Sequence, residues 1–144
     1  MHTAAELIEL IEQTNSFDYW YDNQIIVACE LLQKLAQEEF DFLLTSWQRR
    51  SDDWNLRFAS ILNCRECFET AETLAGIIHI GSYRTASIAL VELAGFENIE
   101  ILRKIKNLSH ILDSFEIKFF DRINGSSIDR EVLEKLRSII FLRE

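Results

Sequence analysis

The sequence predicts an all-α fold, and three observations support this fold class. Proline is absent and glycine occurs only four times among 144 residues, so the chain lacks the residues that most often interrupt regular structure. Apolar residues recur at three- and four-residue spacing along most of the chain, which is typical of amphipathic helices. A hydrophobic content of 48% is enough for a buried core. We therefore expect a single all-helical domain over residues 1–144 with about eight helices.

Local signals place the helix boundaries. Thr3 is followed by Glu6 at capping-box spacing and begins the first helix. Ser51 is a good N-cap for a later helix, with Asp52 and Asp53 placed favourably against its positive end. With the apolar spacing, these signals predict helices from residue 3 to near 14, from 25 to about 36, over 40–47, from 51 onward, and over roughly 66–79, 82–94, 97–106, 108–121 and 127–142.

A faint internal repeat has an offset of 27 residues. Residues 57–61 (RFASI) match residues 84–88 (RTASI), and each segment carries a small alanine at the same position. Two consecutive helix pairs, roughly 54–80 and 81–107, then share one register of core positions. Repeated helical hairpins bury a continuous core through contacts between neighbours. The repeat predicts a short HEAT-like α-solenoid, and an irregular helical bundle is the alternative.

Charge is distributed unevenly along the chain. The first 41 residues hold nine acidic residues against Lys34 alone, a net charge of −8. The other 103 residues hold 15 acidic and 14 basic residues, a net charge of −1. An acidic surface attracts basic partners and repels phosphates, so we expect a basic protein partner and no nucleic acid. We find no signal peptide and no apolar run of the roughly 20 residues that span a bilayer, so we expect no membrane and a cytoplasmic location.

An aromatic run lies within this acidic segment, at residues 17–22. It forms either a connector or the first turn of the second helix. Successive helical residues turn by about 100°, so three large side chains in a row cannot all face one interior. Either the run supplies an exposed aromatic anchor, or Trp20 plugs the core while the two tyrosines face water. The candidate partner-binding residues are the run and nearby acids, namely Asp18, Tyr19, Trp20, Tyr21, Asp22, Glu38, Glu39, Asp52 and Asp53.

The sequence contains no recognisable motif of an enzyme active site. Cys64 and Cys67 form one CxxC, but no second pair completes a zinc quartet, and the strand that usually precedes a redox pair is missing. The three histidines have no metal-ligand spacing, and no glycine-rich phosphate loop is present. The paired carboxylates fall at expected helix starts, where solvation explains them. We expect no catalytic residue, no metal and no cofactor, and we expect Trp54 to be structural.

One stretch resembles a known family. The pattern Trp47-x₆-Trp54-x-x-Arg57-x-Ala59-x-x-Leu62 is similar to small HEAT-like helical immunity proteins of bacterial polymorphic-toxin and contact-dependent inhibition systems, and immunity protein 30 is the nearest family. The likeness covers roughly residues 38–107 and rests on a helix-hairpin pattern. It implies a cytoplasmic protein that neutralises a cognate toxin, often a nuclease.

Three functions follow as hypotheses. The first is an immunity protein that blocks a basic, nuclease-type toxin domain through the acidic aromatic surface. The second is a helical-repeat adaptor without toxin specificity, which predicts a groove on one face. The third is a thiol redox or metal module that uses the CxxC. The oligomeric state stays open.

Overall fold

The computed structural model describes residues 2–13 and 16–141, and every regular element within them is a helix. The all-α prediction is confirmed, and eight helices in this part of the chain have seven or more residues. The bounds are α1 Ala4–Glu12, α2 Phe17–Tyr19, η1 Trp20–Gln24, α3 Ile25–Lys34, α4 Gln37–Ser46, η2 Trp47–Arg49, α5 Asp52–Ala59, η3 Leu62–Arg65, α6 Phe68–Ile80, α7 Tyr83–Ala94, α8 Ile99–Arg103, α9 Leu108–Lys118, α10 Phe120–Asn124 and α11 Ser127–Phe141.

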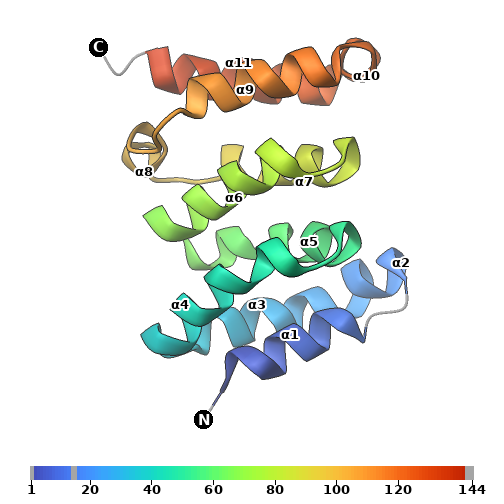
Figure 1. Cartoon of the computed structure of the whole chain (residues 1–144), viewed down its shortest axis with the longest axis vertical. Coiled ribbons are helices and arrows are strands. Elements are labelled where there is room, and N and C mark those ends of the chain that lie inside the picture. Colours follow the sequence, from blue (N-terminus) through green and yellow to red (C-terminus); the bar gives the residue numbers. More distant parts are fainter. Residues whose placement is uncertain (1, 14–15, 142–144) are drawn as a thin grey trace.

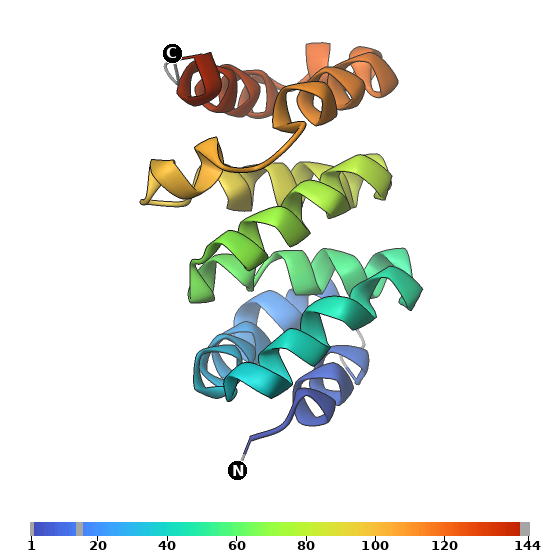
Figure 2. The ribbon, with the colours of Figure 1, turned by 60° about the vertical axis from the view of Figure 1, so that its left-hand side comes forward.

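Successive helical hairpins stack along the longest axis, with the two ends of the chain at opposite ends of the stack (Figure 1). One layer holds α1, α4, α6 and α9, each in contact with the next. The other layer holds α5, α7 and α11 in the same manner, and α3 packs against α1 and η3. The turned view shows the same order (Figure 2). Each hairpin buries its apolar faces against its neighbours, so one hydrophobic core extends from α1 to α11.

The internal repeat marks two neighbouring helices of one layer. Its alanines, Ala59 on α5 and Ala86 on α7, are fully buried, and these two helices pack against each other. The predicted helix pairs, residues 54–80 and 81–107, would join α5 to α6 in one hairpin. This pairing is wrong, because α6 forms its hairpin with α7. Only residues 81–82 separate α6 from α7, which brings the chain straight back, whereas η3 intervenes between α5 and α6.

Side-chain caps begin helices where the sequence predicts them. Thr3 Oγ1 accepts a hydrogen bond from the Glu6 backbone N–H at 3.2 Å, which begins α1. Ser51 Oγ accepts a hydrogen bond from the Trp54 backbone N–H at 3.1 Å, which begins α5. Each cap satisfies a donor that the helix itself leaves unpaired. These two starts are therefore encoded locally.

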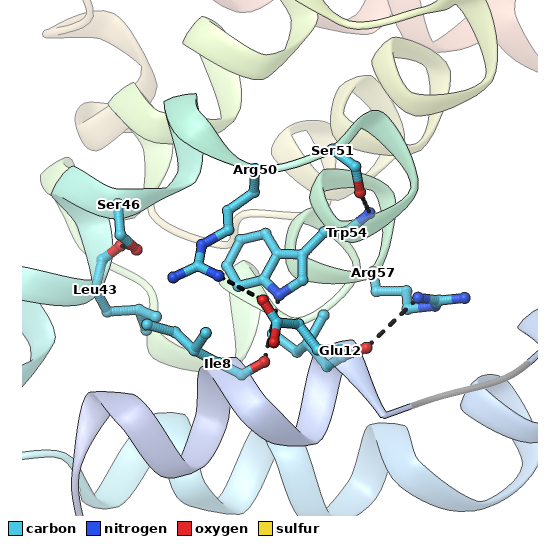
Figure 3. A network of polar contacts seen from close by, with 9 residues as sticks. Ile8, Glu12, Leu43, Ser46, Arg50, Ser51, Trp54 and Arg57 are labelled. Atoms are coloured by element: carbon cyan, nitrogen blue, oxygen red, sulfur yellow. Dashed lines mark hydrogen bonds and ion pairs between the residues drawn. The ribbon is translucent and has the colours of Figure 1, made fainter.

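Trp54 joins α5 to α1 (Figure 3). Its side chain is buried, and Nε1 donates a hydrogen bond to the Ile8 carbonyl oxygen at 3.3 Å. The Arg50 guanidinium lies 5.6 Å from the indole centroid and pairs with Glu12 at the end of α1. Arg57 donates to a second main-chain carbonyl of α1 at 3.4 Å. The structural role predicted for Trp54 is confirmed, and two residues of the pattern that carries the family resemblance, Trp54 and Arg57, hydrogen-bond to α1.

Candidate functional site

The aromatic run opens one long helical segment. Residues 17–34 pass from α2 through the π-helical turn η1 into α3, so the run is the first part of the second helix and not a connector. The Ile25 backbone N–H donates to the Trp20 carbonyl oxygen, a span of five residues that marks the wide turn. Wide turns of this kind occur inside α-helices often at functional sites. The wide turn alters the angular spacing of successive side chains over residues 20–24.

Trp20 lies in the core and cannot be an exposed anchor. Its side chain has no solvent exposure, and Nε1 donates a hydrogen bond to Ser60 Oγ at 2.9 Å. Ser60 in turn donates to the Arg57 carbonyl oxygen at 2.6 Å. A buried indole needs a partner for its single N–H group, and the end of α5 supplies one. The assignment of Trp20 to the partner-binding surface is therefore corrected, and its alternative interpretation as a core plug holds.

The exposed part of the run is a Tyr–Asp patch, which we define as Asp18, Tyr19, Tyr21 and Asp22. The tyrosine side chains are 49% and 42% exposed, and both aspartates are exposed. The Tyr19 hydroxyl oxygen accepts a hydrogen bond from Gln24 Nε2 at 3.2 Å. Tyr19 and Tyr21 project from different sides of the helical segment, because residues two apart on a helix do not face each other, and each exposed ring has a carboxylate next to it in sequence. This arrangement can bind an apolar surface that carries cations.

Charged residues of helix α7 act on Tyr21 of the Tyr–Asp patch. Partial burial raises the pKa of the Tyr21 phenol, the negative charge of Glu92 raises it further, and the positive charge of Arg84 opposes both. Both charged residues belong to α7, so the phenol lies within electrostatic reach of that helix. Burial also raises the pKa of the Glu92 carboxyl group to about 7. The Tyr21 phenol is therefore influenced by charges of α7 as well as by its own helical segment.

Asp52 has a structural role that the sequence does not show. Its carboxylate accepts hydrogen bonds from the Ser82 backbone N–H at 3.0 Å, from Ser82 Oγ at 2.7 Å and from Thr85 Oγ1 at 2.8 Å. Burial alone would raise the pKa of Asp52, but these hydrogen bonds outweigh it and hold the pKa below its ordinary value. Asp52 thus joins the start of α5 to the start of α7. Asp52 and its neighbour Asp53 are both exposed, so the hydrogen bonds to α7 are what distinguish Asp52.

We expect Asp52→Asn to lower the free energy of unfolding by about 1 kcal/mol, because the amide cannot accept all of these hydrogen bonds. The folded-state pKa lies below the ordinary value of 3.8, so the stabilisation is complete above that value and is lost as the pH falls through the folded-state pKa. Urea unfolding of Asp52→Asn and Asp53→Asn at pH 7 and pH 3 measures this. Equal losses in the two variants at pH 7 would contradict the role of Asp52.

Glu38 and Glu39 lie at a different edge of the molecule from the Tyr–Asp patch. Glu39 Oε1 accepts a hydrogen bond from the Ala4 backbone N–H at 3.3 Å, at the start of α1. The patch follows the other end of α1, and nine helical residues span about 13 Å. The nine predicted residues therefore do not form one surface. Glu38 is exposed beside Glu39 and contributes to the acidic field rather than to the patch.

A hollow on α4 and η2 lies outside the residues that the sequence predicted for binding. It has a volume of about 370 Å³ and is lined by Phe42, Thr45, Ser46, Arg49 and Arg50. The Phe42 side chain is 58% exposed. Phe42 lies outside the apolar spacing that buries Phe40 and Leu43 on the same helix. A large apolar residue outside that spacing was the sequence signal for an exposed apolar side chain at this position.

The cysteines pair differently from the CxxC hypothesis. Cys64 forms a disulfide with Cys29, and Cys67 is the free cysteine. Residues 64 and 29 meet because η3 packs against α3. Among residues 2–13 and 16–141, no group of three or more histidine, cysteine, aspartate or glutamate side chains has the geometry of a metal site. The expectations of no catalysis and no cofactor stay predictions.

Comparison with known proteins identifies no relative that could help to interpret this site. No protein-family model, no curated protein and no solved structure matches the chain. In the part of the chain that the structure describes, no helix has both the length and the apolarity needed to cross a membrane. The resemblance to immunity proteins therefore stays an expectation. A proposal for the function rests on the residues of the site.

Proposed function

We propose that this chain is an immunity protein that binds and neutralises a basic toxin domain, a nuclease, through the Tyr–Asp patch. The observation that carries this proposal is the pair of exposed tyrosines, Tyr19 and Tyr21, between the exposed carboxylates of Asp18 and Asp22. Tyrosine offers a large, rigid contact surface, and such anchors dominate the binding energy of protein interfaces.

The charge of the surrounding surface supports a basic partner. Of the nine acidic residues in the first 41, all but Glu39 are exposed, and Lys34 is the segment's single base. Such a field speeds the encounter with a positively charged protein. Nucleases present cationic surfaces because they bind phosphates. An acidic inhibitor that covers such a surface competes directly with the nucleic acid.

The experiment that tests the proposal is co-expression with the protein encoded immediately upstream. We expect cells to survive that protein only when this chain is present, and we expect the two proteins to co-purify as a salt-sensitive complex. The absence of both toxicity and a complex would overturn the proposal.

We expect Asp18→Asn with Asp22→Asn to slow association with the toxin about tenfold at low salt and to flatten the salt dependence of the association rate. The two carboxylates supply steering charge at the patch itself. Glu131→Gln with Glu134→Gln is the matched control, because both residues are exposed on α11 at the far end of the stack. Stopped-flow association rates measured across salt concentrations give the result. Equal slowing by the two double variants would show that net charge acts without a local site.

The hollow at Phe42 supports the second hypothesis, a helical-repeat adaptor. Its exposed ring and the Arg49 guanidinium fit a peptide that carries an apolar and an acidic side chain. The survival assay separates the two functions. Phe42→Ala leaves protection intact if the Tyr–Asp patch binds the toxin, and it abolishes partner capture if the hollow is the docking site.

A further inference from the structure

The three cysteines converge on one junction of the fold. Cys29 lies on α3, Cys64 in η3 and Cys67 at the N-cap of α6, and all three side chains are half-buried. The disulfide joins Cys29 to Cys64, whose Cα atoms are 5.7 Å apart. Cys67 keeps a free thiol three residues along the chain from Cys64. A disulfide and a thiol thus lie in one short stretch of structure.

The chain keeps Cys67 within reach of Cys64. Disulfide-bonded cysteines have Cα atoms about 4.4–6.8 Å apart, and a spacing of three residues allows this separation when the connection from η3 into α6 closes as a turn. The Cys67 backbone N–H donates to Thr70 Oγ1 at 3.1 Å, and Cys67 Sγ lies 3.6 Å from the same oxygen. The thiol is therefore held at the start of a 13-residue helix and adjacent to the disulfide in sequence.

We propose that Cys67 is an internal resolving thiol that exchanges the Cys29–Cys64 disulfide for a Cys64–Cys67 disulfide. The Cys67 thiolate attacks Cys64 Sγ, a new sulfur–sulfur bond forms between them, and the bond to Cys29 breaks. Cys29 leaves as a thiolate and takes up the proton that Cys67 released. One disulfide and one thiol are present before and after the step, so no oxidant or reductant is consumed.

The exchange removes the covalent link between η3 and the helical segment that carries the Tyr–Asp patch. The Cys29–Cys64 bond fastens α3 to η3, whereas a Cys64–Cys67 bond closes a loop within η3 and the start of α6. The buried side chains of α3 and the hydrogen bonds from Gln33 Nε2 to the Cys64 carbonyl oxygen at 3.0 Å and from Arg65 Nη1 to the Leu32 carbonyl oxygen at 3.0 Å then hold α3 without a covalent link. The step takes place within the protein and needs no partner.

Peptide mapping of the oxidised protein tests the exchange. Arg65 lies between the two cysteines, so trypsin separates them and each pairing links a different pair of peptides. Residues 1–34 contain Cys29, residues 58–65 contain Cys64 and residues 66–84 contain Cys67. The folded protein is incubated at pH 8 or pH 5, its free thiols are blocked with N-ethylmaleimide, and it is then digested.

We expect N-ethylmaleimide to move from Cys67 to Cys29 with time at pH 8 and to stay on Cys67 at pH 5, because the thiolate is the attacking species. Cys67→Ser should retain only the Cys29–Cys64 link. Cys29→Ser, oxidised with glutathione disulfide, should form the Cys64–Cys67 link. A wild-type protein that keeps its label on Cys67 at pH 8, or a Cys29→Ser protein that yields only glutathione adducts, would overturn the proposal.

Discussion

Trp20→Ala is expected to lower the free energy of unfolding by about 3–5 kcal/mol, because it removes a fully buried indole and leaves a cavity in the core. The loss includes the hydrogen bond from Nε1 to Ser60, which closes the contact between η1 and the end of α5. Urea unfolding followed by circular dichroism measures the change. Binding of the toxin by the folded fraction should change far less, because the side chain does not reach the surface.

Two further variants divide this effect into its parts. Trp20→Phe keeps an aromatic ring in the core and loses the N–H donor, so its cost should be smaller than that of Trp20→Ala. Ser60→Ala leaves the indole N–H group buried without this acceptor and should cost about 1–3 kcal/mol. If Trp20→Ala unfolded at the wild-type urea concentration while toxin binding collapsed, the ring would be a surface anchor after all.

Helices and their starts were predictable from the sequence because their signals are local. Thr3 and Ser51 lie next to the backbone groups that they cap, and the structure places both caps as predicted. The equivalence of α5 and α7 also followed from the repeat, since Ala59 and Ala86 occupy equivalent buried positions. The choice of which helices pair as a hairpin did not follow from the repeat. It depends on the connections, since only two residues join α6 to α7 whereas η3 lies between α5 and α6.

The candidate site was only partly predictable, since its geometry depends on distant residues. A rotation of about 100° per residue cannot identify the buried member of the aromatic run, because the π-helical turn at residues 20–24 changes that rotation. Asp52 binds Ser82, 30 residues away, and Cys29 meets Cys64 across 35 residues. Local sequence contains neither contact.

Replacing both patch tyrosines, Tyr19→Ala with Tyr21→Ala, is expected to raise the dissociation constant of the proposed toxin complex by about 10²–10³-fold. Exposed aromatic anchors at the centre of an interface commonly cost about 2 kcal/mol each on truncation, and each 1.4 kcal/mol corresponds to about a tenfold change. The two effects need not add, because the side chains share one helical segment. Most of the change should appear as faster dissociation, measured by surface plasmon resonance at fixed salt.

Controls for this double variant distinguish the patch from exposed apolar surface in general. Ile117 on α9 is 78% exposed in the hairpin at the other end of the stack, so Ile117→Ala removes exposed apolar surface far from the patch. We expect Ile117→Ala to leave the dissociation rate unchanged. Tyr19→Phe with Tyr21→Phe retains the rings and should retain most of the affinity. If the alanine double variant dissociated as slowly as Ile117→Ala, the toxin would bind elsewhere, and the hollow at Phe42 would be the next surface to vary.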